Sequence, residues 1–210
     1  MNELLSNIII LAPPILLALT LHEYAHGYVA YRLGDPTAKS SGRLTLNPLN
    51  HLDPLGTLAF FLIHIGWAKP VPVNGAYFRN GRKDMLWVAL AGPITNLVLA
   101  VLSAAAAKAI MFLAPLIPAT PMAQAVVLPL FEMVRASIWI NLVLCIFNFL
   151  PIPPLDGSRI LMGILPDGYV RPFASLERYG FVLILILAVT GVLSSLILPL
   201  ISFAEGLLLS

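Results

Sequence analysis

Three residues near the N-terminus form a pattern typical of a metal-dependent hydrolase. His22 and His26 are four residues apart, and Glu23 directly follows the first histidine. At 3.6 residues per turn, both imidazoles lie on one face of a helix and can hold one metal ion, while the carboxylate beside them can activate water. The alternative is that both are interior histidines that hydrogen-bond to neighbouring groups.

A catalytic zinc ion usually has three protein ligands and a water molecule, so a third ligand must come from elsewhere in the chain. Asp156 is the candidate because three prolines precede it, at positions 151, 153 and 154. Prolines prevent a regular helix, so this carboxylate lies on irregular backbone. Alone, Asp156 would be a helix-end or turn residue, but beside a site with two histidines the ligand interpretation is favoured.

The composition places these residues in a membrane protein. Hydrophobic residues make up 59% of the 210 residues and charged residues only 10%, and the mean hydropathy is +0.92. Soluble domains carry about 25% charged residues, so a water-soluble protein is excluded, as is a disordered chain. The net charge of +2 is small and scattered and does not indicate nucleic-acid binding. The single cysteine, Cys145, excludes an internal disulfide and a cysteine-built zinc site.

We therefore expect an all-α polytopic protein embedded in a lipid bilayer, with four full transmembrane helices. About 20 apolar residues span the hydrocarbon core. Four runs lack Lys, Arg, Asp and Glu, namely 4–21, 85–107, 136–155 and 179–204, and the first continues through the 22–26 motif to Tyr31. The segment 54–68 is short for a span, so we interpret it as re-entrant or interfacial. Repeated prolines in 110–131 would break a helix, so we interpret the middle of this stretch as a connecting loop.

The distribution of basic residues predicts the orientation of the chain. Ten of the twelve Lys and Arg residues lie on one side of these spans, and only Lys108 and Arg135 lie toward the other. Basic loops stay in the cytoplasm, so the N-terminus is expected outside. Arg32 should lie near the cytoplasmic interface, ten residues after His22 and six after His26. At 1.5 Å per residue, the metal would then lie roughly 9–15 Å inside that interface.

The chain resembles the site-2 proteases, a family of intramembrane zinc metalloproteases, in its short branch without a PDZ or CBS domain. The matching motifs are 22–26, 42–48 with His51 and 53–54, 66–74, 92–96 and 155–157. The resemblance implies His22, His26 and Asp156 as ligands of one zinc ion and Glu23 as the catalytic acid and base. It also implies a single domain over 1–210, with a core at 4–157 and an accessory helix at 179–204.

The function implied by the resemblance is that of an endopeptidase acting in regulated intramembrane proteolysis. Its substrates would be transmembrane proteins or peptides, cut in or near the transmembrane segment. We expect a multi-pass protein of a prokaryotic cell (inner) membrane, with the active site toward the cytoplasm. The rival hypothesis is a non-hydrolytic membrane protein, either a metal transporter or a scaffold. Glu23 discriminates between them, because a transporter needs no general base beside its ligands.

Two asparagines are candidates for stabilising an oxyanion or contacting the substrate. Asn148 belongs to a polar stripe at helical spacing, with Ser137, Asn141 and Cys145, and Asn96 is the second candidate. The alternative for both is hydrogen bonding between helices, which is common in membrane bundles. Gly92, four residues before Asn96, is expected to allow close contact between helices.

A small β-strand or hairpin is expected near 67–76, where a substrate could bind. In an extended segment, Pro70 and Pro72 leave one edge without N–H donors, while Val71 and Val73 keep donors on the other. An unwound substrate could then add as a strand to that edge. The alternative is an ordinary proline-rich interfacial loop. His51 and His64 are interpreted as local hydrogen-bonding residues, so neither is assigned to zinc.

Overall fold

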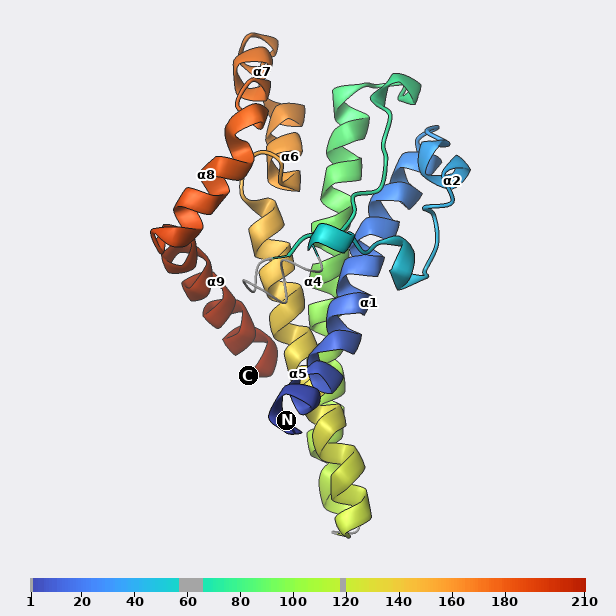
Figure 1. Cartoon of the computed structure of the whole chain (residues 1–210), viewed down its shortest axis with the longest axis vertical. Helices are drawn as coiled ribbons and strands as arrows, with labels where there is room; N and C mark the ends of the chain where they lie inside the picture. Colours follow the sequence, from blue (N-terminus) through green and yellow to red (C-terminus); the bar gives the residue numbers. More distant parts are fainter. Residues whose placement is uncertain (1, 57–65, 118–119) are drawn as a thin grey trace.

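The computed structural model describes residues 2–56, 66–117 and 120–210, and the regular structure in these ranges is helical (Figure 1). The α-helices are α1 (Asn2–Arg32), α2 (Thr37–Ser40), α4 (Arg82–Leu113), α5 (Pro121–Phe149), α6 (Asp156–Ile164), α7 (Asp167–Ala174), α8 (Glu177–Val189) and α9 (Val192–Leu209). Short 3-10 turns are η1 (Pro48–Asn50), η2 (Gly75–Tyr77) and η3 (Ala114–Leu116).

Four helical segments within the described ranges are long and apolar enough to cross a membrane. They are Ser6–Arg32, Arg82–Leu116, Pro121–Phe149 and Val192–Leu209. In addition, α7 and α8 together pass the same test but are bent by 65° at the break between them. The expected all-helical membrane protein with about four spans is therefore confirmed at this level.

The connecting loop expected in the middle of 110–131 is found there, and it is short. Helix α4 continues to Leu113, and α5 already begins at Pro121. A proline in the first turn of a helix is tolerated because the N–H that it lacks has no partner inside the helix. The hydroxyl of Thr120 caps this start by accepting from Ala123 N at 3.2 Å. Pro129 lies inside α5, as transmembrane helices allow where neighbouring groups compensate.

The fourth predicted span, 179–204, is not one helix. The chain breaks between α8 and α9, where Gly191 has a φ of 75°, and the two helices form an open angle in Figure 1. A residue in this left-handed conformation cannot continue a right-handed helix, and glycine adopts it at little cost. The span that passes the length test is therefore Val192–Leu209, displaced toward the C-terminus.

The β-element expected near 67–76 is not a strand in the described part of the chain. Residues 66–74 are extended without regular structure, and the one bridge is the antiparallel pair Leu52 and Ala68. A ladder requires repeated donors, and the two prolines at positions 70 and 72 supply none. Most of 54–68, including His64, lies outside the described residues, so the re-entrant interpretation of that segment stays a prediction.

The helices α1, α4 and α5 pack against one another, and α9 packs on α5. Three buried alanines of α4, Ala100, Ala104 and Ala107, lie in one core with residues of α5 and α9. Small residues let neighbouring transmembrane helices approach closely. This packing fixes the relative positions of the three helices that bring the predicted metal ligands and their supporting residues together.

Candidate metal centre

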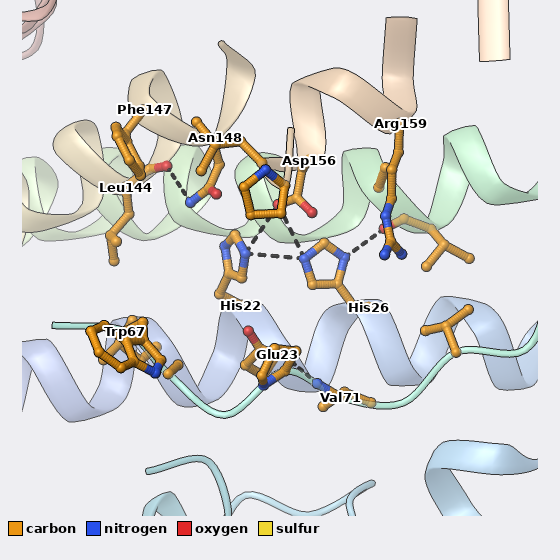
Figure 2. Close-up of a pocket in the computed structure, with 18 of the residues that line it drawn as sticks. His22, Glu23, His26, Trp67, Val71, Leu144, Phe147, Asn148, Asp156 and Arg159 are labelled. Atoms are coloured by element: carbon orange, nitrogen blue, oxygen red, sulfur yellow. Dashed lines mark hydrogen bonds and ion pairs between the residues drawn. The ribbon is translucent and has the colours of Figure 1, made fainter. Parts of the chain in front are cut away.

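The side chains of His22, His26 and Asp156 meet at one point between α1 and α6 (Figure 2). The two histidine Nε2 atoms are 3.0 Å apart, and each lies 3.2 Å from Oδ2 of Asp156. Both histidines are buried. The two histidines, one helical turn apart, and Asp156 thus form one cluster, as predicted.

The hydrogen bonds of the two rings show which nitrogens face the cluster as acceptors. His26 Nδ1 lies 2.7 Å from the carbonyl oxygen of Val88 and must donate to it. His22 Nδ1 lies 2.6 Å from Oδ1 of Asn96. With the proton on Nδ1, a neutral imidazole presents a lone pair at Nε2, so both rings are set in the form that binds a metal.

A zinc ion fits this donor set. The third atom, Asp156 Oδ2, is buried and has no hydrogen-bond partner among the described residues. Two imidazole lone pairs and a carboxylate oxygen therefore converge, which is repulsive unless a cation lies between them. Zinc ligands at 2.0–2.2 Å from a tetrahedral ion lie about 3.3–3.5 Å apart, close to the observed 3.0 and 3.2 Å. Two histidines and one carboxylate leave the fourth position for water.

The irregular backbone before Asp156 explains how its carboxylate reaches the histidines. Helix α5 ends at Phe149, and tight turns continue the chain through the prolines to α6, with Ile152 N bonded to Leu150 O at 2.8 Å. Gly157 lies so close to the carbonyl groups of Phe149 and Leu150 that a Cβ would clash with both. The Asp-Gly pair is therefore pressed against the end of α5, and this contact requires glycine at position 157.

The backbone of Gly92 in α4 is in close contact with the imidazole rings of His22 and His26. A Cβ at this position would lie 2.6 Å from His22 Nε2 and still closer to His26 Nε2. Real Cβ atoms do not approach other heavy atoms this closely. The close contact predicted for Gly92 is therefore a contact between the backbone of α4 and the metal-binding rings themselves.

A cavity of about 350 Å³ opens beside the cluster. Glu23, Asn148, Trp67 and Val71 line it together with the three ligand residues (Figure 2). Asn148 Nδ2 donates to the carbonyl oxygen of Leu144 at 2.9 Å, which leaves its second N–H for the cavity. Carboxylates, an amide and a strip of extended backbone thus surround a space large enough for part of a peptide.

Comparison with known proteins assigns the chain to a family. The model described as Peptidase family M50 matches residues 10–190. The chain belongs to peptidase family M50. It is therefore an intramembrane zinc metalloprotease, consistent with the candidate spans and the ligand cluster. The sequence-based family assignment is confirmed, and the transporter and scaffold hypotheses are not retained.

The relatives are bacterial proteins described as candidate zinc metalloproteases. YwhC of Bacillus subtilis is 42% identical over 190 residues, covering 90% of this chain and 84% of the relative. Rip2 of Mycolicibacterium smegmatis is 32% identical over 184 residues, covering 85% of this chain and 66% of the relative. Rip2 of Mycobacterium tuberculosis (strain H37Rv) is 30% identical over 186 residues, and the chain spans 63% of its length. No solved structure matches the chain significantly.

Asn96 of this M50 protease lies behind the histidines and is not among the residues that line the cavity. It is fully buried, and its Nδ2 donates to Asn141 Oδ1 at 2.8 Å. Asn141 in turn donates to the carbonyl oxygen of Ser137 at 2.8 Å, and the hydroxyls of Ser137 and Ser103 are 2.8 Å apart. Of the two interpretations of Asn96, substrate contact and hydrogen bonding between helices, the structure agrees with the second, because Asn96 joins His22 to a polar network across α1, α4 and α5.

Three supporting groups of the M50 site were not assigned from the sequence. The carbonyl oxygen of Val88, which holds His26, is a backbone atom, and no residue pattern identifies it. Asn141 and Asn96 were both noted as polar residues in the sequence, but the hydrogen bond between them was not predicted. Arg159, one turn after Asp156 on α6, lines the cavity, and its position near a predicted ligand could have marked it. His51 lies outside the cavity lining and bonds to Thr45 O at 2.8 Å.

Replacing Asn96 by alanine is expected to weaken zinc binding roughly 10- to 100-fold, the usual effect of losing a group that orients a metal-binding histidine. The variant removes the acceptor for His22 Nδ1, so the ring loses its fixed tautomer and orientation. Zinc affinity is measured by competition with a chromophoric chelator. Ser103→Ala, at the far end of the network, is the matched control and should bind zinc as the wild type does. Equal affinities for Asn96→Ala and Ser103→Ala would contradict this role.

Proposed function

We propose that this M50 protease hydrolyses peptide bonds within or next to transmembrane segments of other membrane proteins. The observation that carries the proposal is the position of the cavity, which is lined by residues inside the membrane-spanning helix α1. His22 and Glu23 lie inside a helix of 27 apolar-rich residues that is long enough to cross a membrane. In an intact helix the peptide bonds are shielded inside a cylinder of side chains about 10–12 Å in diameter. A substrate helix must therefore unwind before its backbone reaches Glu23.

The chemical roles follow from the positions of the side chains. His22, His26 and Asp156 would hold the zinc ion, which would supply a Lewis acid for water and for the scissile carbonyl. Glu23 takes a proton from the attacking water and passes it to the leaving amide nitrogen. Asn148 directs its second N–H toward the oxygen that becomes negatively charged, since a donor fixed in advance stabilises such an oxyanion.

The active site is proposed to open toward the cytoplasm of a prokaryotic cell, in its inner membrane. Arg32 ends α1, Arg82 begins α4 and Arg159 lies in α6. The C-terminal end of α1, the N-terminal end of α4 and α6 lie toward the same end of the molecule in Figure 1. Basic residues are retained on the cytoplasmic side, and the relatives are bacterial. Water then reaches Glu23 from the same side as the extended segment 66–74.

The whole chain is proposed to act as one membrane domain, with 179–204 as an accessory segment. Ile197 and Ile201 of α9 pack into the core beside α5. Gly180 of α8 lies so close to the carbonyl group of Pro153 that a Cβ would clash with it. The accessory segment therefore supports the proline-rich turn that carries Asp156 into the site.

The proposal is tested by mapping cleavage sites in a single-pass membrane protein reconstituted with the purified protease. Mass spectrometry should find cuts in the cytoplasmic half of the substrate span, roughly 9–15 Å from the interface, as the helix rise between the histidines and Arg32 predicts. A zinc chelator should stop cleavage, and added zinc should restore it. Cuts confined to the external half, or equally fast cleavage of a soluble unfolded protein, would contradict the proposed substrate class and orientation.

A further inference from the structure

The extended segment 69–74 is bound to its surroundings through three backbone N–H groups. Lys69 N donates to His51 O at 2.9 Å, Val71 N donates to Oε2 of Glu23 at 2.8 Å, and Asn74 N donates to Oδ2 of Asp35 at 2.7 Å. The two outer contacts fix the ends of the segment. The middle contact ends on the carboxylate that performs the proton transfer in the proposed mechanism.

We propose that the backbone N–H of Val71 positions the catalytic carboxylate of Glu23 and does not pair with substrate. This inference rests on the proposed role of Glu23. Hydrogen bonds to a carboxylate are among the stronger ones in proteins, and Val71 is only 8% exposed, so little water competes for its N–H. One oxygen of Glu23 is thereby held, and the other stays available to the cavity (Figure 2).

The residues around Val71 make this contact rigid. Its neighbours Pro70 and Pro72 have fixed φ angles, which restricts the backbone on both sides of this N–H before substrate arrives. The side chain of Val71 also packs toward α1, because a Cβ at Gly27 would lie 3.1 Å from Val71 Cγ1. Gly27 follows Glu23 by one helical turn, so the same helix accepts both the backbone and the side chain of Val71.

This assignment changes the predicted substrate binding, in which the N–H groups of both Val71 and Val73 pair with a substrate strand. An N–H that already donates to Glu23 is not a donor for substrate at the same time. Val73 also lines the cavity, and no hydrogen bond of its N–H is found within the described ranges. The N–H of Val73 is therefore the one that pairs with substrate along this edge, while the N–H of Val71 positions Glu23.

Three variants separate these roles because proline removes an N–H and alanine keeps it. Val71→Pro should lower kcat roughly 10- to 100-fold, the effect expected when a reacting group is misplaced, with KM and zinc content close to those of the wild type. Val71→Ala keeps the N–H but loses the side-chain packing on Gly27, so it should lower kcat much less than Val71→Pro does. Val73→Pro should raise KM and leave kcat near the wild-type value.

Other outcomes would overturn the proposal. A raised KM with unchanged kcat in Val71→Pro would return this N–H to the substrate, and a higher rate would show that the contact blocks the base. If Val71→Ala lost as much kcat as Val71→Pro, the side chain and not the N–H would be responsible.

A second measurement does not depend on activity. Amide hydrogen exchange of the zinc-loaded protein, labelled with ¹⁵N-valine and free of substrate, should be slower at Val71 than at Val73. Glu23→Ala should remove the protection at Val71. Rapid exchange at Val71 in the wild type would refute the contact even if Val71→Pro failed to fold. Protection at Val71 in a protein that cut no membrane substrate would instead contradict the proposed function and leave the contact standing.

Discussion

Gly92→Ala is expected to abolish zinc binding and, with it, peptide hydrolysis. The added methyl group would lie 2.5 Å from Cε1 of His22 and within 2.6 Å of the Nε2 atoms that form the cluster. Neither ring can retreat, because His22 is held by Asn96 and His26 by the carbonyl oxygen of Val88. Either the rings rotate out of the ligand geometry or α4 moves away from α1, and both changes separate the three ligand atoms.

The measurement is the zinc content of the purified variant after loading, determined by elemental analysis together with circular dichroism to show that the helices persist. Gly206→Ala is the matched control, since Gly206 also lies in a helix and a Cβ there meets nothing within 4 Å. The control should keep one zinc ion and full activity. A Gly92→Ala protein that held zinc with wild-type affinity would show that the rings do not rest on α4 as described.

The parts of the site that sequence reasoning predicted are those fixed by local rules. The spacing of His22 and His26 sets both rings on one helix face whatever the rest of the chain does. The first three spans follow from the length of apolar sequence that a bilayer requires, but the third, expected at 136–155, is α5 at Pro121–Phe149. Asp156 was predicted because a two-histidine site needs a third ligand and because of the family resemblance, and the structure brings it to 3.2 Å from both rings.

The ends of the helices were predicted less well, because a proline can begin a helix, lie inside it or follow its end. Pro121 begins α5 and Pro129 lies inside it, yet Pro151 follows directly after the helix ends. Which of these happens depends on whether capping groups and neighbouring helices satisfy the freed carbonyls. The break at Gly191 was missed for a similar reason, since glycine is also common inside transmembrane helices.

The roles of Asn96 and Val71 depended on contacts between distant parts of the chain. Asn96 was recognised as a polar residue in a span, but the rotation of α4 decides whether it faces substrate or a ligand, and the structure turns it toward His22. Val71 and Glu23 are 48 residues apart, and their contact joins a backbone N–H to a side chain. Patterns of residue types contain no information on such a contact.

Glu23→Gln is expected to keep zinc and lose hydrolysis by about 10²- to 10⁴-fold, the range attributed to a general acid and base. Glutamine has nearly the same shape, and its carbonyl oxygen can still accept the N–H of Val71, so the cavity and ligand cluster persist. The amide cannot take a proton from water or return one to the leaving nitrogen. His22→Ala, His26→Ala and Asp156→Ala should each lose zinc as well as activity, because each removes one atom of the cluster.

Zinc content and cleavage of a transmembrane peptide are measured in parallel on the same preparations. Glu132→Gln is the matched control, because this exposed glutamate lies on α5 and lines a different cavity, away from the ligand cluster. It should match the wild type in both measurements. Zinc-loaded Glu23→Gln that cleaved at the wild-type rate would remove Glu23 from the proton transfer. Full zinc occupancy and activity in Asp156→Ala would refute the three-ligand site, since two histidines alone would then suffice to hold the catalytic ion.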